Sequence, residues 1–154
     1  MKNLGVLSLV ALLAFAPAAH AQNHAIGITV SASPALVYAY EANAYLEIQA
    51  GTGLSFSKVE GRDSELSTNV GGGLVVTLPR SSGFQFRLIG VGAFLVVSAA
   101  GGTSVGVTIP VPFLGLGFRS GNYELIAAPQ FDYSYLGGHI FNMRLVTGQV
   151  RYRF

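Results

Sequence analysis

The chain has 154 residues, enough for one domain, and 51% of them are hydrophobic while only 10% are charged. Because a soluble domain carries about 25% charged residues, this composition favours a lipid environment. The absence of cysteine excludes disulfide scaffolds, thiolate metal sites and cysteine nucleophiles, and a net charge of +2 without a basic tract does not favour a nucleic-acid partner.

The first 21 residues have the three-part order of a secretory signal peptide. Lys2 supplies the positive start, residues 4–15 are an apolar run, and Ala19 and Ala21 form an A-x-A cleavage site. The apolar run is shorter than the roughly 20 residues that a membrane-spanning helix needs. The sequence therefore predicts a signal peptide at residues 1–21 and a mature barrel domain at residues 22–154.

In the mature chain, apolar and polar side chains alternate with period two, which is typical of β-strands with two different faces. In residues 44–56, for example, Leu46 and Ile48 share one face and Glu47 and Gln49 share the other. Most of these segments are as long as the roughly 9–11 residues that a membrane β-strand needs. Eight strands are predicted, at about residues 24–31, 35–41, 44–57, 66–78, 84–97, 105–118, 123–134 and 140–154.

Residues 88–118 carry no charge, and a run of this length also suggests a membrane-spanning helix. Seven glycines and two prolines, Pro110 and Pro112, lie within the run, a density that is unusual for a membrane helix. Small and polar residues at 99–104 divide it into two halves. The pattern favours a hairpin of two strands over helices.

An apolar face toward lipid and a polar face toward a lumen are the pattern of a transmembrane β-barrel. Since no backbone N–H or C=O can remain unpaired in hydrocarbon, the sheet must close. The predicted fold is therefore an all-β, closed, antiparallel, up-and-down transmembrane β-barrel of eight strands. Short turns at residues 41–43, 79–83 and 119–122 are expected to be periplasmic, together with both termini. Aromatic residues near both strand ends, among them Phe84, Tyr123 and Phe94, are interpreted as interfacial girdles.

The last strand ends on Phe154, with Tyr152 and Val150 on the same face. This segment resembles the closing strand of bacterial outer-membrane β-barrel proteins. The resemblance implies that Val150, Tyr152 and Phe154 are the signal read by the barrel-assembly machinery. The whole mature chain is similar to the small eight-stranded family that includes the transmembrane domain of outer membrane protein A. Long extracellular loops are common in that family, whereas none here exceeds about eight residues, which argues against a large adhesive surface.

The strand pattern also places six charged side chains inside the barrel, where a charge must be paired. We interpret them as a structural salt-bridge plug, and a gate on a narrow channel is the alternative. An eight-stranded lumen is just wide enough for side chains to fill, so no open pore is expected. The six candidates are Glu47, Arg87, Glu124, Asp132, Arg151 and Arg153.

Charged residues also gather in the second predicted extracellular loop. They are interpreted as a solvated loop tip, and the alternative is a contact with lipopolysaccharide phosphates. Lys58 and Arg62 are the candidates in the loop, and Arg144, expected on the lipid-facing side of the last strand, could join them.

The fifth and sixth predicted strands are apolar on both faces. Their expected lumen-facing residues form either a dry packed interior or a slot for an acyl chain. These residues are Ile89, Val91, Ala93, Leu95, Pro110, Pro112, Leu114 and Leu116.

Ser134, Asp132 and His139 are residue types that acyl transfer uses, and some small outer-membrane barrels modify lipid A. The H-x-S-N motif of one such deacylase family lacks its serine here, because Ile140, Phe141 and Asn142 follow His139. No catalytic residue, metal site or cofactor is therefore predicted. The predicted function is an integral outer-membrane protein with an envelope-structural or interaction role, in contact with lipid and lipopolysaccharide. A lipid A or phospholipid-modifying enzyme and a secreted barrel that binds an acyl chain are the alternatives.

Overall fold

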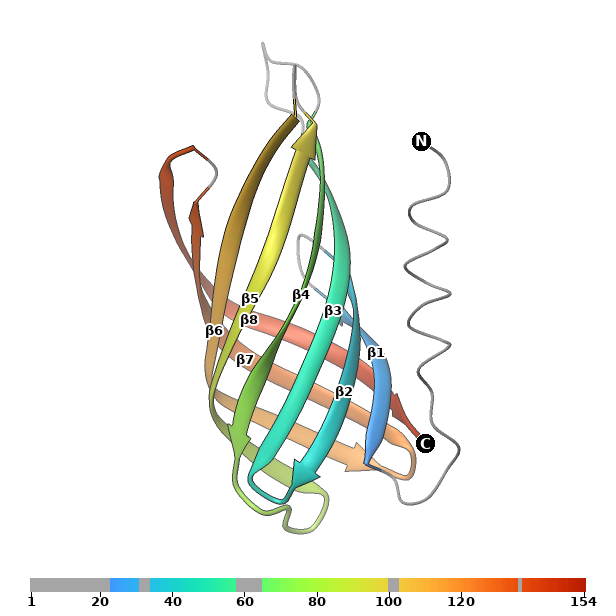
Figure 1. Cartoon of the computed structure of the whole chain (residues 1–154). Coiled ribbons are helices and arrows are strands. Elements are labelled where there is room, and N and C mark those ends of the chain that lie inside the picture. Colours follow the sequence, from blue (N-terminus) through green and yellow to red (C-terminus); the bar gives the residue numbers. More distant parts are fainter. Residues whose placement is uncertain (1–22, 31–33, 58–64, 100–102, 136) are drawn as a thin grey trace.

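A computed structural model describes residues 23–30, 34–57, 65–99, 103–135 and 137–154. Each strand pairs antiparallel with its neighbours in the chain, and the first pairs with the last, so the sheet closes into an eight-stranded barrel (Figure 1). The predicted fold class and strand number are confirmed. The predicted signal peptide lies outside the described residues. The strands are β1 (His24–Val30), β2 (Ala35–Asn43), β3 (Leu46–Ser57), β4 (Glu65–Thr77), β5 (Phe84–Ala99), β6 (Thr103–Ser120), β7 (Tyr123–Tyr135) and β8 (His139–Arg153).

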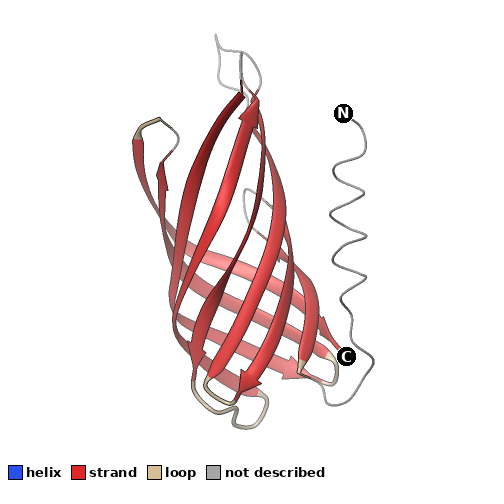
Figure 2. Cartoon of the chain, in the orientation of Figure 1, coloured by secondary structure: helices blue, strands red, loops and turns tan. Residues whose placement is uncertain are grey.

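Figure 2 shows that strands and short connections make up the described part of the chain. Within that part, no helix has the length and apolar character needed to cross a membrane.

The two ends of the barrel differ. The β2–β3, β4–β5 and β6–β7 turns lie at one end with the C-terminus, and we call this the turn end (Figure 1). The opposite, loop end is uneven because β1 has 7 residues and β6 has 18. Pairing of β1 with β8 stops at Val30 and Gly148, although β8 begins at His139.

Side chains alternate between an outward apolar face and an inward face of polar or small residues. On β3, Ile48 and Leu54 are 43% and 62% exposed, whereas Glu47 between neighbouring outward residues is 1% exposed. The same alternation, predicted from the sequence, holds along β4 and β7. At the turn end, outward aromatic rings pair across strands, with Phe84 against Phe118 and Tyr123 against Tyr152.

A β-bulge on β5 reverses the predicted faces of that strand. Val76 pairs with Ile89 and Thr77 with Arg87, so Leu88 is an extra residue, and both Leu88 and Ile89 face outward. Beyond it, Gly90, Gly92, Phe94 and Val96 line the lumen. The sequence-based placement of Ile89, Val91, Ala93 and Leu95 in the lumen was wrong, as was that of Phe94 in a girdle, because one inserted residue moves every later side chain to the other face.

A second irregularity lies on β6 around Leu114. The register shifts between Pro112 and Leu116, and Leu114 has a φ of 47° and is 75% exposed. Pro110 and Pro112 face the lumen as predicted, but Leu114 and Leu116 face outward. Most of the residues from which an acyl-chain slot was predicted therefore lie on the outward face of the barrel and not in the lumen.

A third bulge lies on β8, opposite Pro129. Ala128 pairs with Thr147 and Gln130 with Arg144, so Leu145 and Val146 are consecutive outward residues, 76% and 71% exposed. Proline has no N–H to donate, which is why it is found at bulges within sheets. The bulge turns Arg144 into the lumen, and its predicted lipid-facing orientation was wrong.

Candidate functional site: the barrel lumen

Charged side chains fill the lumen at the turn end. Every member contacts at least one residue of opposite charge in the group, and we call the group the basal charge cluster. It consists of Glu41 on β2, Glu47 on β3, Arg80 in the β4–β5 turn, Arg87 on β5, Arg119 on β6, Glu124 on β7, and Arg151 and Arg153 on β8.

Glu47 is a fully buried acidic member of the basal charge cluster. It is 1% exposed and accepts hydrogen bonds from Arg87 and from Arg151, whose Nη1 lies 2.9 Å from both carboxylate oxygens. Gln49 donates a further hydrogen bond to Glu47 Oε1 at 2.6 Å. This pairing makes the burial of Glu47 tolerable, because an unpaired charge at this depth would cost several kcal/mol.

Glu124 and Glu41 join the remaining arginines. Arg153 Nη2 lies 3.0 Å from Glu124 Oε2 and 2.6 Å from Glu41 Oε1, so one guanidinium links β2, β7 and β8. Arg80 Nη2 donates to Glu124 Oε1 at 2.8 Å. The bond from Arg153 to Glu41 and the bond from Arg80 to Glu124 join parts of the wall that are not neighbours in the sheet, so these two bonds cross the lumen and occupy it.

Of the six charges predicted to face the lumen, five lie in the basal charge cluster, and Asp132 lies apart from it. The sequence reasoning missed Glu41, Arg80 and Arg119. Arg119 had been assigned to a turn, whereas β6 continues to Ser120 and pairs Arg119 with Glu124. The opposite charges of Arg119 and Glu124, which face each other across a short hairpin, were the sequence feature that could have placed Arg119 in the lumen.

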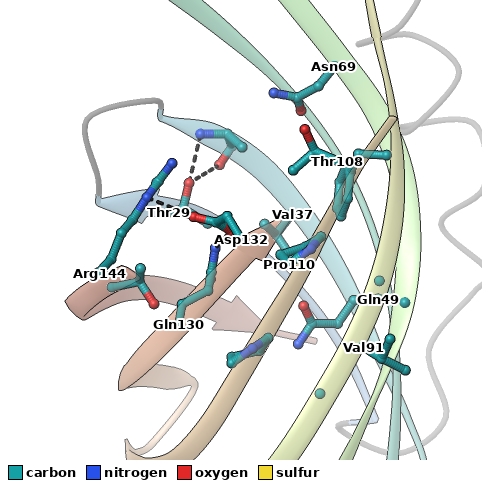
Figure 3. Close-up of a pocket in the computed structure, with 18 of the residues that line it drawn as sticks. Thr29, Val37, Gln49, Asn69, Val91, Thr108, Pro110, Gln130, Asp132 and Arg144 are labelled. Carbon is teal, nitrogen blue, oxygen red and sulfur yellow. Dashed lines mark hydrogen bonds and ion pairs between the residues drawn. The ribbon is translucent and has the colours of Figure 1, made fainter. Parts of the chain in front are cut away.

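A cavity of about 320 Å³ lies next to the basal charge cluster in the lumen. Gln49 and Gln149 line it and also hydrogen-bond to Glu47 and Arg151, so the cluster closes the cavity toward the turn end. Apolar and polar side chains are mixed around its lining (Figure 3). The apolar residues include Val37, Val75, Phe94, Val96, Pro110 and Pro112, and the polar residues include Thr29, Asn69, Thr108, Gln130, Asp132, Asn142, Arg144 and Thr147.

Asp132 and Arg144 form an ion pair in the lining of this cavity (Figure 3). Arg144 Nε lies 3.0 Å from Asp132 Oδ2, although its N–H is not aligned for a hydrogen bond. Gln130 Nε2 donates to the other oxygen, Asp132 Oδ1. The pair is balanced in charge, with one cation for one anion.

The residue types of an acyl-transfer site are not brought together. Ser134 faces the lumen, with its hydroxyl 2.8 Å from that of Thr108. His139 lies outside, with Nδ1 2.7 Å from the Tyr133 hydroxyl. A nucleophile and its base need a direct hydrogen bond, and here they bind other partners.

The three residues of the closing-strand pattern lie at the turn end. Val150 and Tyr152 face outward, and the Phe154 ring stacks on His24 with centroids 6.1 Å apart. Lys58 and Arg62 lie outside the described residues.

No protein-family model matches the chain, and no curated protein matches its sequence. Among solved structures, the Neisserial surface protein A crystal structure superposes with a TM-score of 0.60 over 85% of this chain and 93% of that chain, at 18% identity. The fold is that of a small outer-membrane β-barrel. The Yersinia pestis outer membrane protein Ail gives TM-scores of 0.46 in a phospholipid bilayer nanodisc and 0.42 in a crystal. Those comparisons have 15% and 17% identity, and cover 85% of this chain and 97% and 93% of the Ail chains.

Proposed function

We propose that the protein is an integral component of a bacterial outer membrane, with a structural or interaction role in the envelope and no open pore. The proposal that the barrel has no open pore rests on the basal charge cluster, whose ion pairs cross the lumen. The outward apolar face supports the membrane location, since exposed side chains such as Phe86, Leu114 and Leu145 would be in contact with water in a soluble barrel.

In this proposal the turn end is periplasmic and the loop end is extracellular. Short turns at the periplasmic side and longer connections outside are the usual arrangement of these barrels. Lys58 and Arg62 belong to the connection between β3 and β4 and would contact lipopolysaccharide phosphates. Arg144 leaves that set because it pairs with Asp132 in the lumen.

The test is gel mobility of the outer-membrane fraction, heated and unheated in mild detergent. A closed barrel resists unheated detergent, so we expect a heat-dependent mobility shift in the Sarkosyl-insoluble fraction. A protein that shows no shift and is recovered in the soluble periplasm would refute the membrane assignment. It would instead support the secreted acyl-chain binder.

A further inference from the structure

The basal charge cluster does not balance its own charge. It holds five arginines and three glutamates, so its side chains sum to +2. Of the four other acidic residues in the sequence, Asp132 pairs with Arg144. The remaining three are Glu60 and Asp63, which belong to the β3–β4 connection in the sequence, and Glu65, which pairs with Ser57 at the loop end of β3 and β4.

The residues that the structure does not describe hold two of the seven acidic side chains, Glu60 and Asp63. Residues 1–22, 31–33, 100–102 and 136 contain no aspartate or glutamate. Among the described residues, no further acidic side chain lies at the turn end to offset the two excess positive charges of the cluster.

The excess charge is accessible at the turn-end mouth. Arg87, Arg151, Arg153, Glu47 and Glu124 have side chains no more than 6% exposed, whereas those of Arg80, Arg119 and Glu41 are 19%, 17% and 19% exposed. The outermost layer of the cluster is thus two guanidinium groups and one carboxylate, each partly exposed to solvent.

Arg80 and Arg119 are held beside one another by a single atom. Both donate to Glu41 Oε1, at 3.2 Å and 3.0 Å, and the same oxygen also accepts from Arg153. Glu41 Oε1 is therefore saturated, and Arg119 Nε is buried without a hydrogen-bond partner among the described residues. Two adjacent cations with donors left over form an anion-binding arrangement.

We propose that Arg80 and Arg119 form a phosphate-binding site at the turn-end mouth of the barrel. Guanidinium groups present planar pairs of donors that match phosphate oxygens, and a phosphate carries enough negative charge to offset the excess in the cluster. The phosphate group is either free in solution or the headgroup of a lipid in the adjoining leaflet. The second source fits the location, since Leu78 and Phe84 on either side of the Arg80 turn are outward and exposed.

The first experiment uses the refolded full barrel in a maltoside detergent, which contains no phosphate. Inorganic phosphate is titrated at constant ionic strength against sodium chloride, and the midpoint of heat-induced unfolding is followed by gel mobility. We expect a saturable rise of the midpoint with phosphate and none with additional chloride. An equal rise with both salts would mean simple screening and would overturn the proposal.

Three variants locate the effect. Arg80→Gln and Arg119→Gln each remove one donor group and are expected to weaken phosphate binding about tenfold or more, since hydrogen bonds to charged groups contribute at least this much. Arg144→Gln is the matched control, because it removes a lumen arginine that has its own acidic partner, and it should leave phosphate binding unchanged. Equal losses in all three variants would refute a local site.

Glu41→Gln keeps the test decisive if the arginine variants fail to refold. The amide still accepts a hydrogen bond, but the excess charge rises by one, so phosphate should bind more tightly than to the wild type. Weaker or unchanged binding in this variant would contradict the proposal.

A lipid arm separates the two sources of the phosphate. Phosphatidic acid and uncharged diacylglycerol are added to the same micelles at equal mole fraction. Stabilisation by phosphatidic acid and by free phosphate identifies the phosphate group itself as the ligand, and stabilisation by phosphatidic acid alone identifies a lipid headgroup. Absence of both effects, or equal stabilisation by diacylglycerol, would refute the site.

Discussion

Arg151 on β8 donates from Nη1 to both carboxylate oxygens of Glu47 on β3, at 2.9 Å each, across the inside of the barrel. The two strands are separated in the sheet by β1 and β2. The pair therefore ties together parts of the wall that share no backbone hydrogen bonds.

Replacing Glu47 with glutamine should destabilise the barrel strongly. The change removes the buried carboxylate that Arg87 and Arg151 share, and breaking a buried pair in this way costs about 3–5 kcal/mol. Urea titration followed by gel mobility measures the free energy of unfolding. Asp132→Asn is the control, because its partner Arg144 is 31% exposed and water can solvate it, so its loss should be about 1 kcal/mol. Equal losses for the two variants would contradict the structural role of the basal charge cluster.

The wild-type barrel should show no ion conductance in a planar lipid bilayer, since the cluster occupies the lumen. The double variant Glu47→Ala with Arg151→Ala removes the central pair and is expected to give stepwise currents. Stable channels formed by the wild type would instead support the alternative interpretation, in which the lumen charges form a gate on a narrow channel.

The β5–β6 seam should be the locally weakest part of the wall. Pairing between these strands is present at Ile89–Phe113 and at Phe94–Thr108 but not between residues 90–93 and 109–112, where Pro110 and Pro112 lack N–H donors. Backbone amides at Val91 and Ala93 are expected to exchange hydrogen faster than those at Val96 and Val97 of the same strand, as NMR in nanodiscs can measure. Uniform protection along β5 would show that the seam is closed.

Leu114 is held in the left-handed region, with a φ of 47°. Glycine adopts this backbone conformation without the strain of about 1–2 kcal/mol that a side chain incurs. Leu114→Gly should therefore destabilise the barrel less than Leu116→Gly by about that amount, both residues being outward and exposed. The comparison uses the urea-dependent gel shift, and a larger loss for Leu114→Gly would argue against the strain.

The period-two pattern was enough to predict the strands and their faces wherever the ladder is regular. On β3, β4 and β7 the residues expected to face lipid do so. On β5, β6 and β8 the strands were predicted, but some residues predicted to face the lumen face outward and the reverse. A bulge adds one residue to a strand and so exchanges the faces of the residues beyond it, and the composition of the strand gives no sign of this. Pro129 opposite Leu145 was the one local sign of such a bulge.

Only part of the basal charge cluster could be predicted, because the period-two pattern applies to strands and not to turns. Glu47, Glu124 and Arg151 lie at regular inward positions, whereas Arg80 enters the lumen from a turn, where periodicity says nothing about direction. The excess of arginine over glutamate depends on Arg80 and Arg119, which the sequence pattern did not place in the lumen.

The early end of β1 leaves one side of the described wall lower than the other. Beyond the Val30–Gly148 pair, no described residue pairs with residues 139–147 of β8 on the side away from β7. On the opposite side the wall is paired up to Ala99 and Thr103. The described wall is therefore paired to different heights around its circumference. On its low side the outward apolar residues Leu145 and Val146 lie on a strand that is paired with β7 alone among the described strands, so any acyl chain that reaches this height meets a sheet edge rather than a closed wall.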